Sequence, residues 1–352
     1  MIQTPPFIDL HTHTRYPDNN SFPINEIEDA AINGGYSDVL AMANSEIPID
    51  SIANLNIARE FDEKLKIKIH RVGALTENLE GKKLTNFKEF IKEGITIFSD
   101  DGKSLIDDGL AENAFKEIGK LNGAIFQHCE KNCHTNPGDI APPNKFNELI
   151  TIHENEESEI IRRDLGLVKK FKTRYHVQHL SSKKSVELIK EAKENNLPVT
   201  AEVTPHHLLR SNLDINTNDG SLKMYPPLRS EEDRQALIEG LKDGIIDVIA
   251  TDHAPHPSAT KEVSFKESAR GVVGLESAFV ALFSSNIFTL DELIYFMSKN
   301  PQNILKSLGY DTSNTLANTW IETDSVFSTK SFFKNSAFEN LEVKIKKEFS
   351  NV

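Results

Sequence analysis

Residues 7–15 read FIDLHTHTR, an apolar run that ends in two histidines and an arginine. In an extended strand, His11 and His13 stand two positions apart and therefore point to the same face. Taken alone, a pair with this spacing is more often an ordinary core or surface pair than a metal site. Its place at the end of the first β-rich run favours the metal interpretation, because active sites of parallel barrels lie at strand ends.

Working outward from this stretch, short β-rich runs alternate with helical stretches as far as about residue 255, the pattern of repeated βα units. The eight runs are 7–13, 37–44, 66–75, 94–101, 123–130, 174–181, 198–206 and 245–254. Eight is the number at which a parallel sheet closes into a barrel. The sequence therefore predicts an α/β protein with a (β/α)8 TIM barrel over residues 1–310 and a polar C-terminal tail over 311–352.

Composition narrows the classes of partner. The 352 residues carry a net charge of -13, which would repel nucleic acid and anionic membranes. No apolar run is long enough to cross a bilayer, the first ten residues lack the features of a signal peptide, and the chain has only two cysteines, Cys129 and Cys133. We therefore expect a cytoplasmic protein that binds neither nucleic acid nor membranes.

Four further runs also end in side chains that can bind metal or titrate. They end in SDDG at 99–102, HCE at 128–130, HVQH at 176–179 and TDH at 251–253. Any one of these endings is unremarkable by itself, but five coincident strand ends favour a site of nitrogen and oxygen ligands suited to zinc. Such an ion lowers the pKa of its water to about 7, which indicates hydrolysis of an unactivated C–N bond. Strand alternation does not decide between Asp100 and Asp101 as a ligand.

Arg15 lies just beyond the histidine pair. A guanidinium at this place could bind a substrate carboxylate through two parallel hydrogen bonds. A surface ion pair explains its spacing equally well.

From about residue 7 to residue 309 the chain resembles bacterial-type dihydroorotases of the amidohydrolase superfamily. The motifs that carry the resemblance are DLHTHTR at 9–15, FSDDG at 98–102, HCE at 128–130, YHVQH at 175–179, EVTPHH at 202–207, PPLR at 226–229, ATDHAPH at 250–256 and GLE at 274–276. The resemblance implies a metal-dependent hydrolase barrel beside a β-sandwich. Only six residues precede Phe7, so we expect the sandwich to be reduced or absent, with a remnant in the tail around 334–339.

The resemblance also implies the roles of individual residues. It implies one or two zinc ions per chain, bridged by Asp101, with the ligands His11, His13, Asp101, His128, His179 and Asp252. Asp252 would in addition be the catalytic base. The substrate would be held by Arg15, Asn44, His256, Arg270 and Gly271. Glu202, His206, His207 and Lys223 also fall in matching motifs, and we expect them to be structural or to support the ligands from behind, without a direct part in the chemistry.

The reaction implied is the reversible hydrolysis of L-dihydroorotate to N-carbamoyl-L-aspartate in pyrimidine biosynthesis. Two alternatives remain: a hydantoinase-like or allantoinase-like hydrolase of another cyclic amide, and a silent structural subunit that associates with aspartate transcarbamoylase. Arg15 argues against the first, because a substrate without a carboxylate would leave a charge unpaired. The complete ligand set argues against the second. Tyr225, which stands where the family usually has an asparagine, bears on substrate identity, and a homodimer is also among the expected partners.

Overall fold

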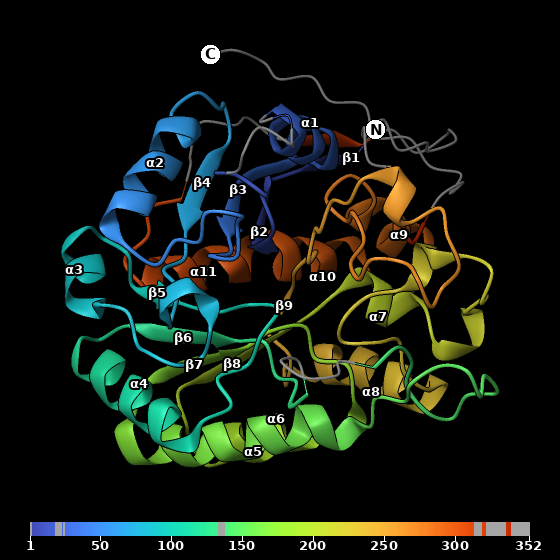
Figure 1. The fold of residues 1–352 in the computed structure, drawn as a ribbon. Helices are drawn as coiled ribbons and strands as arrows, with labels where there is room; N and C mark the ends of the chain where they lie inside the picture. The colour runs from blue at the N-terminus through green and yellow to red at the C-terminus, as the bar shows by residue number, and fades with distance from the viewer. Residues whose placement is uncertain are drawn as a thin grey trace.

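The computed structural model describes residues 2–17, 23, 25–132, 138–312, 319–321 and 336–338. Eight parallel strands form its barrel (Figure 1). They are β2 (Phe7–Thr12), β3 (Tyr36–Ala41), β4 (Lys68–Arg71), β5 (Ile97–Phe98), β6 (Ala124–Gln127), β7 (Arg174–Val177), β8 (Val199–Val203) and β9 (Val248–Ile249). Each predicted run overlaps one of these strands, so the barrel prediction is confirmed.

The strands pair in chain order, β2 to β4 in one sheet and β5 to β9 in another. Two parallel bridges join the sheets into a closed ring, Gly73 with Phe98 and Thr12 with His253. The second bridge brings the first and last barrel strands together, so the ends of β2 and β9 lie side by side.

Helices surround the strands in the βα order (Figure 1). The helices between strands are α1 (Asn25–Gly34), α2 (Ile52–Asp62), α3 (Phe87–Lys92), α4 (Asp108–Lys120), α5 (Glu154–Phe171), α6 (Lys183–Glu194), α7 (Pro205–Leu209) and α8 (Glu231–Lys242). After β9 come α9 (Ala278–Ser284), α10 (Leu290–Ile294), a π-helical turn (Tyr295–Lys299) and α11 (Asn300–Ser307). The short 3₁₀ turns are η1 (Glu77–Leu79), η2 (Asn212–Asp214), η3 (Gly220–Leu222) and η4 (Ser258–Thr260). Ser182 caps α6 through the backbone N–H of Ser185, and none of the described helices is long and apolar enough to cross a membrane.

One end of the barrel is closed by apolar side chains. The strand interior carries residues such as Leu10, Val72 and Phe126, and Leu308 and Tyr310 pack against them from just beyond α11. The Tyr310 hydroxyl accepts a hydrogen bond of 3.1 Å from the backbone N–H of Thr96, immediately before β5. The amino ends of the strands are therefore sealed, which leaves the carboxyl ends for chemistry.

A small antiparallel sheet accompanies the barrel. It pairs β1 (Ile2–Thr4) with β10 (Thr319–Ile321). Farther along the tail, Ser336 bridges to Val273, and Phe338 is buried. Within the described residues this two-stranded sheet agrees with a reduced flanking sandwich, whereas the division of the chain at residue 310 stays a prediction.

Candidate active site

The two histidines at the end of β2 face the same pair of carboxylates. His11 Nε2 lies 3.3 Å from Asp101 Oδ1 and 3.5 Å from Asp252 Oδ1. His13 Nε2 lies 3.3 Å from Asp101 Oδ2 and 2.9 Å from Asp252 Oδ1. Asp101 follows β5 and Asp252 follows β9, so three strand ends converge on one point, as the sequence predicts for a parallel barrel.

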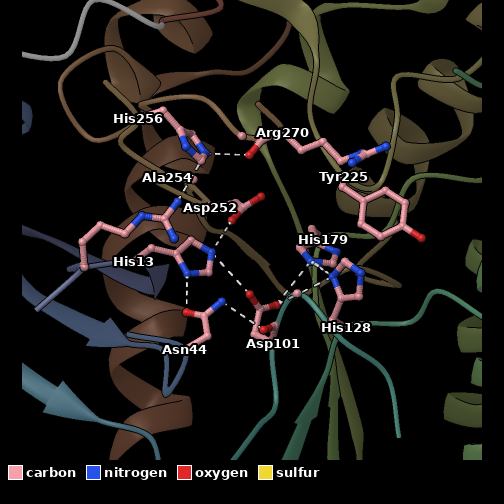
Figure 2. Close-up of a pocket in the computed structure, with 13 residues that line it drawn as sticks. His13, Asn44, Asp101, His128, His179, Tyr225, Asp252, Ala254, His256 and Arg270 are labelled. Carbon is pink, nitrogen blue, oxygen red and sulfur yellow. Dashed lines mark hydrogen bonds and ion pairs between the residues drawn. The ribbon is translucent and has the colours of Figure 1, made fainter. Parts of the chain in front are cut away.

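A second pair of histidines adjoins the first, with the rings of His11 and His179 5.1 Å apart, and Figure 2 shows it beside Asp101. His128 follows β6 and His179 follows β7, and His128 Nδ1 lies 2.9 Å from His179 Nε2. Asp101 Oδ1 is 3.8 Å from His128 Nδ1 and 3.6 Å from His179 Nε2. Asp101 therefore stands between the two histidine pairs, one carboxylate oxygen toward His13 and the other toward His128 and His179.

The structure separates Asp100 from Asp101, which the sequence pattern leaves open. Asp100 Oδ1 accepts hydrogen bonds from the backbone N–H groups of Leu75 (2.8 Å) and Thr76 (3.0 Å), and Oδ2 accepts one from the Thr76 hydroxyl. Asp100 thus joins the loop after β4 to the end of β5, and only Asp101 lies among the histidines.

The residues present fit a divalent metal ion. Ligand atoms of His11, His13 and Asp252 lie within 4.8 Å of one another, and so do those of His11, Asp101 and His179. His11 Nε2 and Asp101 Oδ1 are buried and find no hydrogen-bond partner among the described residues. Buried polar atoms without partners are rare, and imidazole with carboxylate is the donor set that binds zinc and related ions.

The electrostatics of the cluster keep Asp101, Asp252 and His128 in the forms that bind a metal. Burial alone would raise the pKa of Asp101 and of Asp252, but the neighbouring His11 holds both below their ordinary value. Burial, together with His179, lowers the pKa of His128 to about 3. At neutral pH the carboxylates are therefore ionised and His128 is neutral, the forms that bind a metal.

A hydrogen bond at Nδ1 orients each of the two histidines at the end of β2. His11 Nδ1 lies 2.5 Å from Glu202 Oε1, and His13 Nδ1 lies 2.8 Å from Asn44 Oδ1. Because a carboxylate or amide oxygen accepts hydrogen bonds, each Nδ1 carries a proton, which leaves Nε2 as the nitrogen that can bind a metal. Glu202 also accepts a bond of 3.1 Å from the backbone N–H of His179, so this one buried carboxylate supports both histidine pairs.

A cavity of about 290 Å³ opens in front of the cluster. It is lined by all the residues expected to bind substrate, Arg15, Asn44, His256, Arg270 and Gly271. His13, Asp101, His128, His179 and Asp252 line it as well, whereas His11 is fully buried beneath it. Figure 2 shows His256 and Arg270 across the cavity from the histidine cluster.

Arg15 is a cation without a carboxylate partner in this cavity. Its Nε donates to the Pro255 carbonyl at 3.2 Å, and its Nη2 lies 3.3 Å from His256 Nε2. The same His256 nitrogen is 2.6 Å from the Arg270 carbonyl, which can only accept, so Nε2 carries a proton and offers Arg15 no acceptor. Since no described carboxylate forms an ion pair with Arg15, its guanidinium is suited to an anionic ligand.

Three of the site residues hold a left-handed backbone, Arg15 at φ 62°, His179 at φ 30° and Asp252 at φ 47°. Residues other than glycine adopt this region at an energetic cost, and such residues gather at functional sites. The surrounding fold therefore fixes these side chains at some cost to stability.

The other motif residues have different surroundings. His207 Nδ1 lies 2.8 Å from the Thr204 hydroxyl and its Nε2 lies 3.1 Å from the Pro226 carbonyl, which fits the expected structural role. The Tyr225 ring lies 5.1 Å from the ring of His128 and forms part of the cavity wall. Of the long stretch 131–155, residues 133–137 and with them Cys133 lie outside the described residues, and Ile140 is buried in a cluster with Met224. Leu149, in the same stretch, is buried in this cluster as well.

One residue of the site region has no sequence signal at all. Lys261 lies in the long stretch after β9, is only 5% exposed, and belongs to none of the motifs. Its bonds are to backbone carbonyls, so no complementary side chain marks it in the sequence.

Comparison with known proteins places the chain in a family. Residues 1–185 match the family described as Dihydro-orotase-like, and residues 144–310 match the Amidohydrolase family. The dihydroorotase of Elusimicrobium minutum is 38% identical over 310 residues, covering 86% of this chain and 72% of that one. The dihydroorotase of Ligilactobacillus salivarius is 40% identical over 309 residues, covering 85% and 72%.

Solved structures agree on the fold. The L-hydantoinase from Arthrobacter aurescens superimposes with a TM-score of 0.78 at 21% identity, covering 97% of this chain and 81% of that one. The dihydropyrimidinase from Brevibacillus agri gives a TM-score of 0.76 at 19% identity, with the same coverage. The fold is thus that of the cyclic amide hydrolases, and the sequence relationship is closer to dihydroorotases: the chain belongs to the dihydroorotase-like family of amidohydrolases.

Proposed function

We propose that this protein catalyses the reversible hydrolysis of L-dihydroorotate to N-carbamoyl-L-aspartate. Its family supports a hydrolase of cyclic amides. The observation that carries the choice of substrate is Arg15, a guanidinium without a described carboxylate partner in the same cavity as the histidine and aspartate cluster. Dihydroorotate has a ring amide for the cluster and a carboxylate for the arginine.

We further propose that the ions are zinc and that two sites share Asp101. His11, His13 and Asp252 would hold one ion, and His128 and His179 the other, with Asp101 as ligand to both. When bound there, zinc polarises a carbonyl and lowers the pKa of water, which is the chemistry that amide hydrolysis needs.

Asp252 is the proposed proton carrier. Its Oδ1 lies 2.9 Å from His13 Nε2, and the residue lines the cavity. Because its pKa is held below the ordinary value, the carboxylate is ionised at neutral pH and can take a proton from the attacking water. It then returns the proton to the amide nitrogen as the C–N bond breaks. In the direction of ring closure, it takes the proton from the ureido nitrogen that attacks the carboxyl carbon.

Arg15 and Asn44 orient the substrate in this proposal. Arg15 binds the ring carboxylate through its terminal nitrogens, and Asn44 adds one N–H, since its other amide hydrogen donates to the Asp101 carbonyl at 2.9 Å. Arg270 and Gly271 form the facing wall. Such fixed placement brings the amide carbon to the cluster in one orientation.

A second candidate is ring opening of an uncharged cyclic amide. The observation in its favour is Tyr225, which places an aromatic ring, 5.1 Å from the ring of His128, where the family's resemblance leads us to expect an amide. A homodimer, association with aspartate transcarbamoylase and a cytoplasmic location stay predictions that follow from the family resemblance.

The test is turnover by purified, zinc-loaded protein on L-dihydroorotate, dihydrouracil and allantoin at equal concentrations. We expect hydrolysis of dihydroorotate to be the fastest by far. Preference for dihydrouracil or allantoin would move the substrate to the second candidate. No turnover by protein that holds zinc would support the silent structural subunit.

A further inference from the structure

The cavity wall opposite the metal cluster is a loop, residues 254–272, that carries His256, Arg270 and Gly271. Backbone hydrogen bonds close turns within it, such as the one from the Ala269 N–H to the Thr260 carbonyl at 2.9 Å. Others tie it to its neighbours, such as those from the Phe265 N–H to the Thr217 carbonyl at 2.9 Å and from the Gly271 N–H to the Lys223 carbonyl at 3.0 Å. The carbonyls of residues 269 and 271, next to the cavity, accept further bonds from a side chain.

Lys261, itself a residue of this loop, supplies these further bonds. Its Nζ donates to three backbone carbonyls, those of Lys223 at 3.0 Å, Ala269 at 2.9 Å and Gly271 at 3.0 Å. An ammonium group has three N–H donors, so all of them are used. In the part of the chain that the structure describes, no carboxylate forms an ion pair with Lys261, so its bonds are made to the backbone alone.

A second buried lysine extends this support. Lys223 is 2% exposed, and its Nζ donates to Asp139 Oδ1 at 2.9 Å and to the Lys266 carbonyl at 2.7 Å. Asp139 belongs to the packed stretch after β6, so the two ammonium groups join three segments distant in sequence. The loop wall is thereby tied to its neighbours through Lys223 and Lys261.

The bonds of Lys261 are connected to the anion site through the backbone of Arg270. Lys261 binds the carbonyls of residues 269 and 271, on either side of Arg270, whereas the Arg270 carbonyl points the other way and accepts from His256 Nε2 at 2.6 Å. His256 in turn lies 3.3 Å from Arg15. Figure 2 shows His256 beside Arg270 at the rim of the cavity.

The packing leaves little room for the loop to move. Gly271 has φ 118°, and a Cβ built there would lie 2.7 Å from the Ala254 side chain and 3.0 Å from His256 Nε2. A shift of residues 269–271 would therefore displace His256 as well.

We propose that Lys261 is a positioning residue for substrate binding, which fixes the orientation of residues 269–271 and through them the place of His256 beside Arg15. It acts on the carboxylate site without touching the substrate. The inference rests on the proposed function, because it assigns the substrate carboxylate to Arg15. Burial and the neighbouring Lys223 lower the pKa of Lys261 to about 7, so the ammonium form with its three N–H donors predominates only below neutral pH.

The test compares Lys261→Met, which keeps the length of the side chain and removes its N–H donors, with Lys266→Met as the matched control. Lys266 lies in the same loop with an exposed side chain. We expect Lys261→Met to raise KM for L-dihydroorotate about tenfold or more, with kcat changed less than about threefold. Bound zinc should remain at the wild-type level, and Lys266→Met should match the wild type in all three quantities.

Amide hydrogen exchange of residues 254–272 gives a second readout that does not depend on activity. We expect faster exchange in Lys261→Met than in the wild type or in Lys266→Met. Should Lys261→Met fail to fold, Lys261→Gln, which keeps two N–H donors on a shorter side chain, takes its place in both measurements.

The outcomes separate the two proposals. Unchanged KM and unchanged exchange in a folded Lys261 variant would overturn the positioning role, as would a fall in kcat and zinc content at constant KM. Failure of the wild type to hydrolyse dihydroorotate would overturn the proposed function instead, and the exchange measurement would still decide whether Lys261 orders the loop.

Discussion

The two walls of the cavity are built in different ways. The metal-side wall consists of strand ends that the barrel's own hydrogen bonds hold, such as the 2.9 Å bond from the His13 N–H to the His253 carbonyl. The opposite wall is a loop that buried cations hold through backbone carbonyls, as Lys261 does. The first wall presents imidazoles and carboxylates, whereas the second presents Arg270 and binds Arg15, which follows β2, through the Pro255 carbonyl. The difference teaches that one wall is suited to cations and the other to an anion, so a substrate must satisfy both.

If one wall binds metal and the other binds the substrate carboxylate, a substitution in one wall should leave the binding function of the other unchanged. The largest effect is expected on the metal side, for Asp252→Asn. Loss of the proton carrier should lower kcat by about 10³-fold, while KM for dihydroorotate changes little because Arg15 is unaltered. Steady-state kinetics at saturating zinc measures both quantities. A kcat within tenfold of the wild type would remove Asp252 from the proton transfer.

Asp101→Asn and Asp100→Asn form a matched pair within the metal-side wall. Asp101→Asn should weaken zinc binding by about 100-fold or more, because it removes a ligand charge between the two histidine pairs. Asp100→Asn should keep its zinc and lose about 1–3 kcal/mol of stability, because it disturbs three buried hydrogen bonds to Leu75 and Thr76. Zinc titration against a chelator and thermal unfolding measure the two effects. If Asp100→Asn lost its zinc and Asp101→Asn kept it, the assignment of Asp101 as the metal ligand would be reversed.

Where Arg15 meets the opposite wall, Arg15→Ala should lower kcat/KM for dihydroorotate by about 100-fold, since charge-assisted hydrogen bonds to the carboxylate are lost. Zinc affinity should not change. Dihydrouracil, which lacks the carboxylate, serves as the internal control, and its slow hydrolysis should be the same in both proteins. An equal loss for both substrates would show that Arg15 acts on the metal side.

The smallest expected effect is the dependence of zinc affinity on pH. Burial lowers the pKa of His11, but Asp101 and Glu202 outweigh it, so the pKa lies well above the ordinary value, and the pKa of His179 is also raised. A raised pKa means that protons compete with zinc for these nitrogens below neutral pH. Apparent zinc affinity should therefore fall as pH is lowered from about 8 to 6, by about tenfold per pH unit for each proton displaced. Affinity that stays constant over this range would contradict the ligand assignment.

The strand-end wall could be predicted from the sequence because periodicity locates strand ends and barrel geometry brings them together. Strand lengths could not: the run 94–101 contains a strand only at Ile97–Phe98, and the rest is loop in which Asp100 and Asp101 turn to different partners. The packing of the loop after β4 decides between those two aspartates, and no local pattern encodes it.

The contacts that hold the loop wall could not be predicted from the sequence, for a different physical reason. Lys261 binds carbonyls, one of them 38 residues away at Lys223, and every residue has a carbonyl, so no residue type marks the partner. The residues of this wall that were predicted, such as His256, came from the family resemblance rather than from spacing. Glu202 was expected to be structural or to support a ligand, and the barrel interior shows which ligand it supports, because it lies directly behind His11.

The most direct test of the central claim, that one cavity joins a metal-binding wall to an anion-binding wall, is a crystal structure of the protein with zinc and N-carbamoyl-L-aspartate. The account predicts zinc between His11, His13, Asp101 and Asp252, and a ligand carboxylate on Arg15 beside His256. Zinc at this place with the ligand carboxylate bound away from Arg15, or zinc bound elsewhere, would contradict it.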